Sequence, residues 1–294
     1  MNPDELLNKY ADGERDFSSV DFIGADFTKV NLSRADFTGA KLAGVKFFQA
    51  NLSRAVFLNA DLREADLEGA ELPASDLSTA DLMGANLSGA NLSFADLTGA
   101  DLCRSNLMVA KLINTNLVGV NFTRSFLIGA NLRGANLMGA NLTSSNLSQA
   151  YLCEADLREA NLTKTNLQRA FYNEQTRFPE GFNPTKLGTF FLAPEVNLTG
   201  ENLSGVDIPG ANLQGANLAY IDLRKANLLW ANLSGANLSG ANLSGANLSG
   251  VNFLGANLTD VNLDGANLSG ATMPDGVVHA VIQRQIPPQN SQRQ

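Results

Sequence analysis

The chain has 294 residues, of which 44% are hydrophobic, and a formal net charge of -8. This composition can bury a core, and no stretch approaches the ~20 apolar residues that a membrane-spanning helix needs. An acidic chain argues against direct binding to nucleic acid through counterion release, and two cysteines give no disulfide framework. The N-terminal sequence lacks the basic and apolar regions of a signal peptide, so we predict a soluble, cytoplasmic protein.

Residues 1–15 are predicted to form a short helical cap at the start of the chain. Asn2, Pro3 and Glu5 suit the N-cap, the first position and the third position of a helix. The helix is expected to cover the first apolar layer of the structure that follows with Leu6, Leu7 and Tyr10.

Residues 16–172 repeat with a period of five. A large apolar residue recurs at every fifth position from Phe17 to Leu167, which makes 31 positions without a break in register. A small residue, usually Ala, stands two positions earlier. Asn or Asp usually stands directly before the apolar residue, and Ser, Thr or Gly after it. Because internal repeats decide the fold, this first array is predicted to be one repeat domain.

A period of five fits neither a helix nor a straight strand. On an α-helix, successive leucines would step by about 140° and would form no stripe. On a strand they would alternate between the two faces, because five is odd. The chain must therefore bend once per repeat, so that each large apolar residue points to a common axis. The coils would stack ~4.8 Å apart through backbone hydrogen bonds, as a β-solenoid.

The repeat alone does not set the number of sides per coil. Phe17, Phe37 and Phe57 are spaced by 20 residues, and so are Phe27 and Phe47. A coil of four five-residue sides would stack them as two aromatic ladders on opposite sides of a square core. The spacing therefore favours four sides.

The register breaks after residue 172 and resumes one residue out of phase at Leu198, from which it runs to Met273. We predict a capping or linker segment at residues 173–196, a second repeat array at 197–274 and a flexible tail at 275–294. An open end of stacked strands invites aggregation, so a lid is expected there. The aromatic residues around the break would supply it: Phe171, Tyr172, Phe178, Phe182, Phe190 and Phe191.

The repeated phrases ADFTG, ANLSG and ADLTG resemble those of the pentapeptide-repeat family, and the resemblance covers nearly the whole chain. It implies an all-β fold, a right-handed quadrilateral parallel β-helix in two arrays, with the Leu or Phe and the preceding Ala pointing inward. The start LLNKYADGERDF, the break TRFPEGFNP and the ending ATMPDGVVH are similar to segments of cyanobacterial members. Some of those relatives regulate cell differentiation by binding a regulator, so the resemblance implies a partner-binding role.

No group of residues stands apart from the repeat as a catalytic, cofactor or metal site. The one histidine, His279, falls near the C-terminus, and the many Ser and Asp residues occupy repeat positions with a structural role. The glycines recur at intervals of five rather than as a phosphate-binding loop. Cys103 and Cys153 fall on opposite faces of a 20-residue coil and are not expected to pair. We therefore predict a non-enzymatic protein without a cofactor or metal.

Acidic residues concentrate early in the chain, where residues 1–101 contain 17 acids and 8 bases. On 20-residue coils the aspartates fall on two adjacent faces. The simpler interpretation is a charged surface that keeps the protein in solution. The alternative is an acidic rod that mimics DNA and modulates a type II topoisomerase (gyrase), as some pentapeptide-repeat proteins do. The candidate acidic residues are Asp16, Asp21, Asp36, Asp61, Asp76, Asp81, Asp96 and Asp101.

Apolar residues also occupy outward positions where the repeat otherwise places polar ones. A contiguous apolar patch on a surface suggests a protein partner or self-association. We therefore predict a scaffold that binds an unidentified protein partner through its side faces, with self-association left open. The candidate partner-binding residues are Phe48, Met108, Val109, Phe126 and Ile128 on one face of the first array, and Leu229 and Trp230 in the second.

Overall fold

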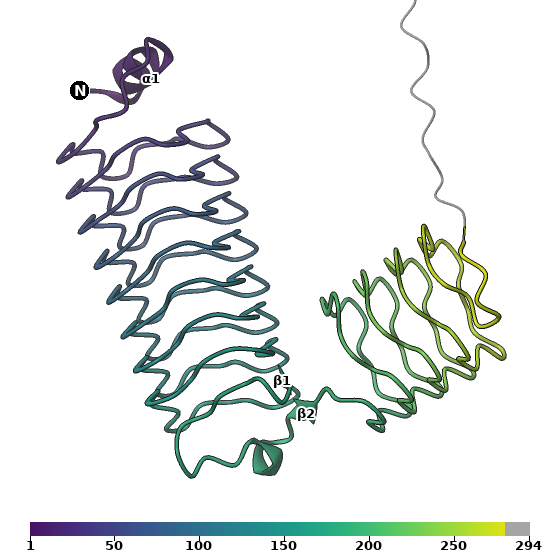
Figure 1. Cartoon of the computed structure of the whole chain (residues 1–294). Coiled ribbons are helices and arrows are strands. Elements are labelled where there is room, and N and C mark those ends of the chain that lie inside the picture. Colours follow the sequence, from purple (N-terminus) through teal and green to yellow (C-terminus); the bar gives the residue numbers. More distant parts are fainter. Residues whose placement is uncertain (280–294) are drawn as a thin grey trace, which may run out of the picture. The chain divides into compact units, whose positions relative to one another are not determined.

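The computed structural model describes residues 1–279 (Figure 1). They form two compact units, the first comprising residues 1–191 and the second beginning at Leu192. Regular elements are few: helix α1 at Pro3–Ala11, the 3-10 helix η1 at Pro184–Leu187, and the strands β1 at Phe171–Tyr172 and β2 at Phe190–Phe191. Within these 279 residues no helix is both long and apolar enough to cross a membrane. Most of the predicted tail, from residue 280 onward, lies outside the described residues.

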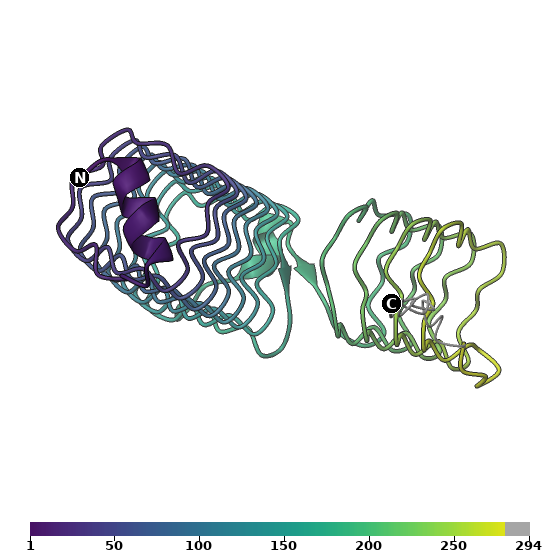
Figure 2. The ribbon, with the colours of Figure 1, turned by 90° about the horizontal axis from the view of Figure 1, so that it is seen from above.

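Each unit is a stack of four-sided coils (Figures 1 and 2). Isolated parallel bridges join a residue to its equivalent in the next coil, for example Asp61 to Asp81 in the first unit and Asn217 to Asn237 in the second. Four repeats of five residues therefore complete one coil, and the chain is a right-handed quadrilateral parallel β-helix. The predicted fold class and the choice of four sides are both confirmed.

In a repeat with Asn or Asp before the inward residue, all five backbone N–H groups are used. In the repeat centred on Leu62, two of them donate to the following coil, one donates to the preceding coil and one closes the turn. The fifth belongs to Arg63, and the Oδ1 atom of Asp61 accepts it at 3.3 Å. The same bond recurs along both units, for instance from the N–H of Thr98 to Asp96 at 2.8 Å. Asn or Asp precedes the inward residue because it satisfies the one N–H that no carbonyl reaches.

The corner of each repeat is a tight turn. In the repeat of Leu62, the N–H of Ala65 donates to the Leu62 carbonyl at 3.1 Å. The residue just before the closing one has positive φ, 55° at Glu64 and 71° at Gly84 in the next coil. Positive φ at this place is typical of a type II turn and favours glycine, so any other residue there carries strain.

The inward leucines and alanines form a continuous core in the first unit, where side chains such as Leu137 are completely buried. Near the N-terminal end, phenylalanines replace leucines and stack from coil to coil. The ring centroids of Phe17 and Phe37 lie 5.9 Å apart, and those of Phe27 and Phe47 lie 5.6 Å apart. Phe37 and Phe47 meet across the core at 6.2 Å. The predicted aromatic ladders on opposite sides of the core are therefore confirmed.

Helix α1 lies across the N-terminal end of the first unit (Figure 2). The Oδ1 atom of Asn2 accepts the N–H of Glu5 at 2.9 Å, which begins the helix as the sequence predicted. Leu6 is completely buried, and Leu7 and Tyr10 pack against the core. The capping helix is confirmed.

An irregular final coil closes the other end of the first unit. Arg177 pairs with Asp156, one residue later than the regular period requires, and β2 pairs in parallel with β1. Phe178 and Phe182 stack on each other with 5.2 Å between their centroids and pack against the core. The break up to residue 191 therefore belongs to the first unit. Phe178 and Phe182 cover its end, whereas Phe191 is 41% exposed.

Replacing Leu137 by Asp is expected to unfold several coils. The Leu137 side chain is completely buried, so the new carboxylate would lie in the core without a partner. We expect the free energy of unfolding to fall by more than about 4 kcal/mol, measured by urea denaturation followed by circular dichroism. Met138→Asp is the control, because it adds the same charge one residue away at a half-buried outward position. An equal loss of stability in both variants would contradict the inward assignment of Leu137.

Candidate functional site

The outward positions of the first unit form four side faces, each one repeat wide. On every face, the residue before the inward one and the two residues after it lie at the surface or at the corner. A partner would meet the protein at these positions. We name each face by its first inward residue: face A contains Phe17, face B Phe22, face C Phe27 and face D Leu32. The inward residues of one face follow one another every 20 residues.

The acidic candidates lie in two columns on adjacent faces, each linked by bridges between successive coils. The column on face A runs through Asp16, Asp36, Val56, Asp76 and Asp96. The column on face B runs through Asp21, Lys41, Asp61, Asp81 and Asp101.

Two basic side chains contact three of the four acids in the column on face B. The guanidinium of Arg63 lies 2.6 Å from the carboxylate of Asp61 and 3.5 Å from that of Asp81. The amino group of Lys41 lies 3.6 Å from the carboxylate of Asp21. The hydrogen bond from Arg63 lowers the pKa of Asp61, although burial acts in the opposite direction. Ion pairs therefore balance about half of the acidic charge of face B.

The aspartates of face A have no such partners. Across residues 1–279, no ion pair involves Asp16, Asp36, Asp76 or Asp96. Their carboxylates serve the local turn instead: Asp96 accepts the N–H of Thr98 at 2.8 Å and its hydroxyl at 2.6 Å. Face A therefore presents most of the uncompensated negative charge of the candidate acidic surface.

The fold does not require an acid at these positions. Where Asn fills the column, its side-chain amide also donates to the preceding coil, as Asn116 does to Asp96 at 3.2 Å and Asn247 to Asn227 at 2.9 Å. Asp96 has no such proton to give to Asp76, and two like charges one coil apart (~4.8 Å) repel each other. Asn would therefore serve the fold better, and the acids of face A are candidates for a role outside it.

An apolar patch lies on face C across two adjacent coils. It consists of Met108, Val109, Phe126 and Ile128, and we use the name for these four residues. The side chain of Val109 is 63% exposed and that of Phe126 is 49% exposed, whereas Ile128 is half-buried. The N–H of Val109 donates to the Ile128 carbonyl at 2.9 Å, which joins the two coils. Phe48 stands on the same face but three coils earlier, so the structure separates it from the patch.

Two members of the apolar patch are unfavourable for the fold. Val109 is β-branched and occupies the turn position that favours glycine, with φ at 50°. Phe126 interrupts a ladder of side-chain amides: Asn106 donates to Asn86 at 3.1 Å in this column, but Phe126, the next residue along, cannot donate to Asn106. Neither side chain is in the core, so packing inside the coil does not explain them.

In the second unit, Trp230 lies over Gly250 of the following coil. A Cβ built on Gly250 would collide with the indole ring, so only glycine fits beneath it, and the Trp230 side chain is 70% exposed. The adjacent Leu229 is half-buried. Tyr220 lies in the same manner over Gly240 and is 72% exposed. The exposed aromatic surface of this unit therefore comes from Trp230 and Tyr220 rather than from Leu229.

Sequence reasoning missed Phe94 and Tyr220. Phe94 is 62% exposed on face D, and both residues occupy the glycine-favouring turn position, with φ of 62° and 58°. The signal is visible in the sequence as an aromatic residue two places after the inward Leu, in NLSFA and NLAYI.

The family model for pentapeptide repeats matches the chain in eight copies, over residues 16–54, 40–78, 80–117, 110–138, 135–171, 195–219, 202–240 and 236–273. The chain belongs to the pentapeptide-repeat family. No curated relative matches it.

Solved structures of other pentapeptide-repeat proteins are similar to this chain. HetL, involved in heterocyst differentiation regulation in the cyanobacterium Nostoc sp. strain PCC 7120, is 34% identical, with 95% of this chain and 100% of that chain covered and a TM-score of 0.22. A pentapeptide-repeat protein of the Arabidopsis thaliana thylakoid lumen is 31% identical, with 41% and 70% covered and a TM-score of 0.31. QnrB1, a plasmid-mediated fluoroquinolone resistance protein, is 20% identical, with 61% and 84% covered and a TM-score of 0.41.

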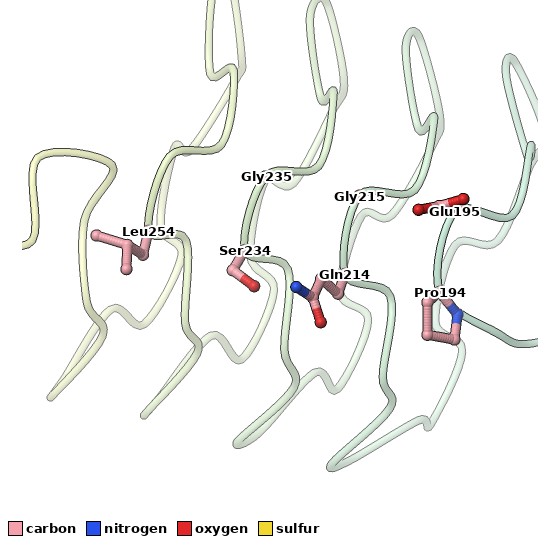
Figure 3. A pocket seen from close by; sticks show the side chains of 7 residues that line it. All are labelled: Pro194, Glu195, Gln214, Gly215, Ser234, Gly235 and Leu254. Atoms are coloured by element: carbon pink, nitrogen blue, oxygen red, sulfur yellow. The ribbon is translucent and has the colours of Figure 1, made fainter.

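This pentapeptide-repeat protein has an open hollow of about 490 Å³ on its second unit. Figure 3 shows side chains from successive coils in a row along it, one carboxylate, one amide, one hydroxyl and one leucine. Over residues 1–279, no group of three or more His, Cys, Asp or Glu could hold a metal ion. We take faces A and C as the candidate site, because their outward residues depart from what the fold requires. The hollow is lined by Pro194, Glu195, Gln214, Gly215, Ser234, Gly235 and Leu254.

Replacing Asp96 by Asn is expected to raise the free energy of unfolding by about 0.5–1.5 kcal/mol. Asn keeps the Oδ1 atom that accepts the Thr98 N–H, and its new amide can donate to Asp76 in the preceding coil. Asp96→Ala is the control, because it removes the charge together with the acceptor, and it should lower stability by about 1 kcal/mol. Urea denaturation measures both changes, and a loss of stability in Asp96→Asn would mean that the acid serves the fold.

Proposed function

We propose that this protein is a non-enzymatic cytoplasmic scaffold that binds another protein through face C, with the apolar patch as the contact. The two units supply regular side faces on which most outward positions carry Asn, Asp, Ser, Thr or Gly. The proposal concerns the positions that depart from this pattern, since the fold gives no reason for them.

The main observation in support of the proposal is the residue Phe126. It stands in a column whose neighbours are asparagines, it forfeits an amide hydrogen bond between coils, and half of its side chain faces solvent. An exposed aromatic residue with no structural gain is typical of a contact that a partner covers. Met108 and Val109 in the preceding coil extend the same surface.

The double variant Phe126→Asn/Ile128→Ser is expected to reduce partner capture at least about tenfold, because it removes a buried aromatic anchor of an interface. The new residues are those that the next coil has at these positions, Asn146 and Ser148, so stability should be unchanged or higher. Capture is measured by affinity pull-down from a native lysate with quantitative mass spectrometry.

The matched control is Val56→Asn/Leu58→Ser, which makes the same kind of change at the same repeat positions on face A. It should leave capture by face C intact. Equal capture by the wild type and the face C variant would reject the apolar patch as a binding surface.

A second candidate function, modulation of a type II topoisomerase by DNA mimicry, is supported by the unpaired aspartates of face A. Their charge density is low, however. Four aspartates over five coils give about one charge per 6 Å, whereas duplex DNA has one per ~1.7 Å. For this reason we rank DNA mimicry below protein binding through face C.

The gyrase hypothesis predicts that excess protein inhibits or alters supercoiling of a relaxed plasmid by DNA gyrase. The double variant Asp76→Asn/Asp96→Asn, which keeps both turn acceptors, should reduce that effect, because it removes two charges from face A. Unaltered supercoiling at the highest protein concentration would remove this candidate.

A further inference from the structure

Face C and its corners carry charges of opposite sign in different coils. Between Asp101 and Glu154 the sequence has no acid. Of the four bases in this interval, Arg104 and Arg124 stand at the corner between faces B and C, whereas Lys111 and Arg133 stand on face D. Two coils earlier, on face C and at the corner that it shares with face B, stand three acids: Glu64, Asp66 and Glu68.

These charges lack counter-charges in the part of the chain that the structure describes. No ion pair there involves Arg104 or Arg124, and none involves Glu64 or Glu68. All four side chains are exposed. These two arginines and two glutamates are therefore available to pair with opposite charges on another molecule.

One pair of these opposite charges is placed symmetrically about the coil of Gly84. In the corner column, Arg104 stands one coil after Gly84 and Glu64 stands one coil before it. On face C, Ile128 lies two coils after this central coil and Phe48 lies two coils before it. A two-fold axis perpendicular to the stack, passing through this coil, would bring Arg104 onto Glu64 and Ile128 onto Phe48 of a second molecule.

We propose that the partner of face C is a second copy of this chain, docked antiparallel so that the face binds itself. The proposal rests on the binding role of the apolar patch proposed above and names the occupant. Because such a pair is isologous, each contact is made twice. The Arg104–Glu64 pair would set the register of the two copies. Phe48 is separated from the apolar patch of its own molecule and would cover the apolar patch of the second copy.

The central coil is shaped for close approach. Gly84, Ser88 and Gly89 present little side-chain bulk there. The carboxylate of Glu64 lies across Gly84, where a Cβ would collide with it, and so reaches toward the proposed axis. An arginine one coil away in the second copy would meet this carboxylate. Lys46 of one copy would lie over the ring of Phe126 of the other, which is a favourable cation–π arrangement.

The size of the contact predicts a weak dimer. Five coils give a strip about 20 Å long and about 10 Å wide. The area of this strip is smaller than the ~800 Å² that each partner buries in a standard stable interface. Since the charged pairs lie at an exposed rim, added salt should weaken the dimer further.

A charge swap tests the proposal. The full-length protein is examined by sedimentation equilibrium at low ionic strength over a wide concentration range. We expect the wild type to approach twice the monomer mass at high concentration. Arg104→Glu and Glu64→Arg should each weaken association at least about tenfold, because like charges then face each other. The double variant Glu64→Arg/Arg104→Glu should restore association to near the wild-type level.

Arg54→Glu is the matched control, because Arg54 occupies the same turn position with positive φ on face D and should leave association unchanged. Circular dichroism confirms that each variant is folded. A wild type that stays monomeric, or a double variant in which association is not restored, overturns the second copy as the occupant. The capture experiment with Phe126→Asn/Ile128→Ser then decides independently whether face C binds a different protein.

Discussion

The fold depends on one local hydrogen bond, from the N–H after the inward residue to the side chain of the Asn or Asp before it. A chain that bends every five residues can give four of its five N–H groups to carbonyls, two in the following coil, one in the preceding coil and one in the turn. The fifth would be lost at each corner without this side chain, as at Arg63 and Asp61. The small polar residue is therefore as much a part of the fold as the inward leucine.

The turn requires an oxygen acceptor but not a charge. The turn needs one oxygen, which Asn and Asp both supply, so the choice between them is free to answer other demands. Asn gains a second bond to the preceding coil, and most of the second unit uses it. Asp forgoes that bond and adds repulsion, as at Asp76 and Asp96. Phe126 departs further from the needs of the fold, because its side chain can neither accept the N–H of the turn nor donate to the preceding coil.

The sequence predicts the fold well because period and geometry leave few solutions. Five residues per bend, the 20-residue spacing of Phe17 and Phe37, and the helix signals at Asn2 suffice for the coil, its size and its cap. The site is less predictable, because pairing between coils depends on side-chain reach. Arg63 contacts Asp81 as well as Asp61, which turns a predicted acidic column into ion pairs. The break lacks a period, so the sequence could not show that its backbone continues the stack at Arg177.

The position of the apolar patch follows from the one-dimensional energetics of a solenoid. Each coil is held only by its two neighbours, so a lost bond in one coil is a local cost of about 1 kcal/mol rather than a failure of the whole core. A coil at an end has one neighbour and depends on its cap, as at the N-terminal end, where Leu6 of α1 is completely buried in the core. The patch occupies coils with regular coils on both sides, where the inward leucines Leu107 and Leu127 remain completely buried. An interior coil can therefore carry the strained turn of Val109 and the missing amide at Phe126, because its neighbours hold the backbone in place from both directions.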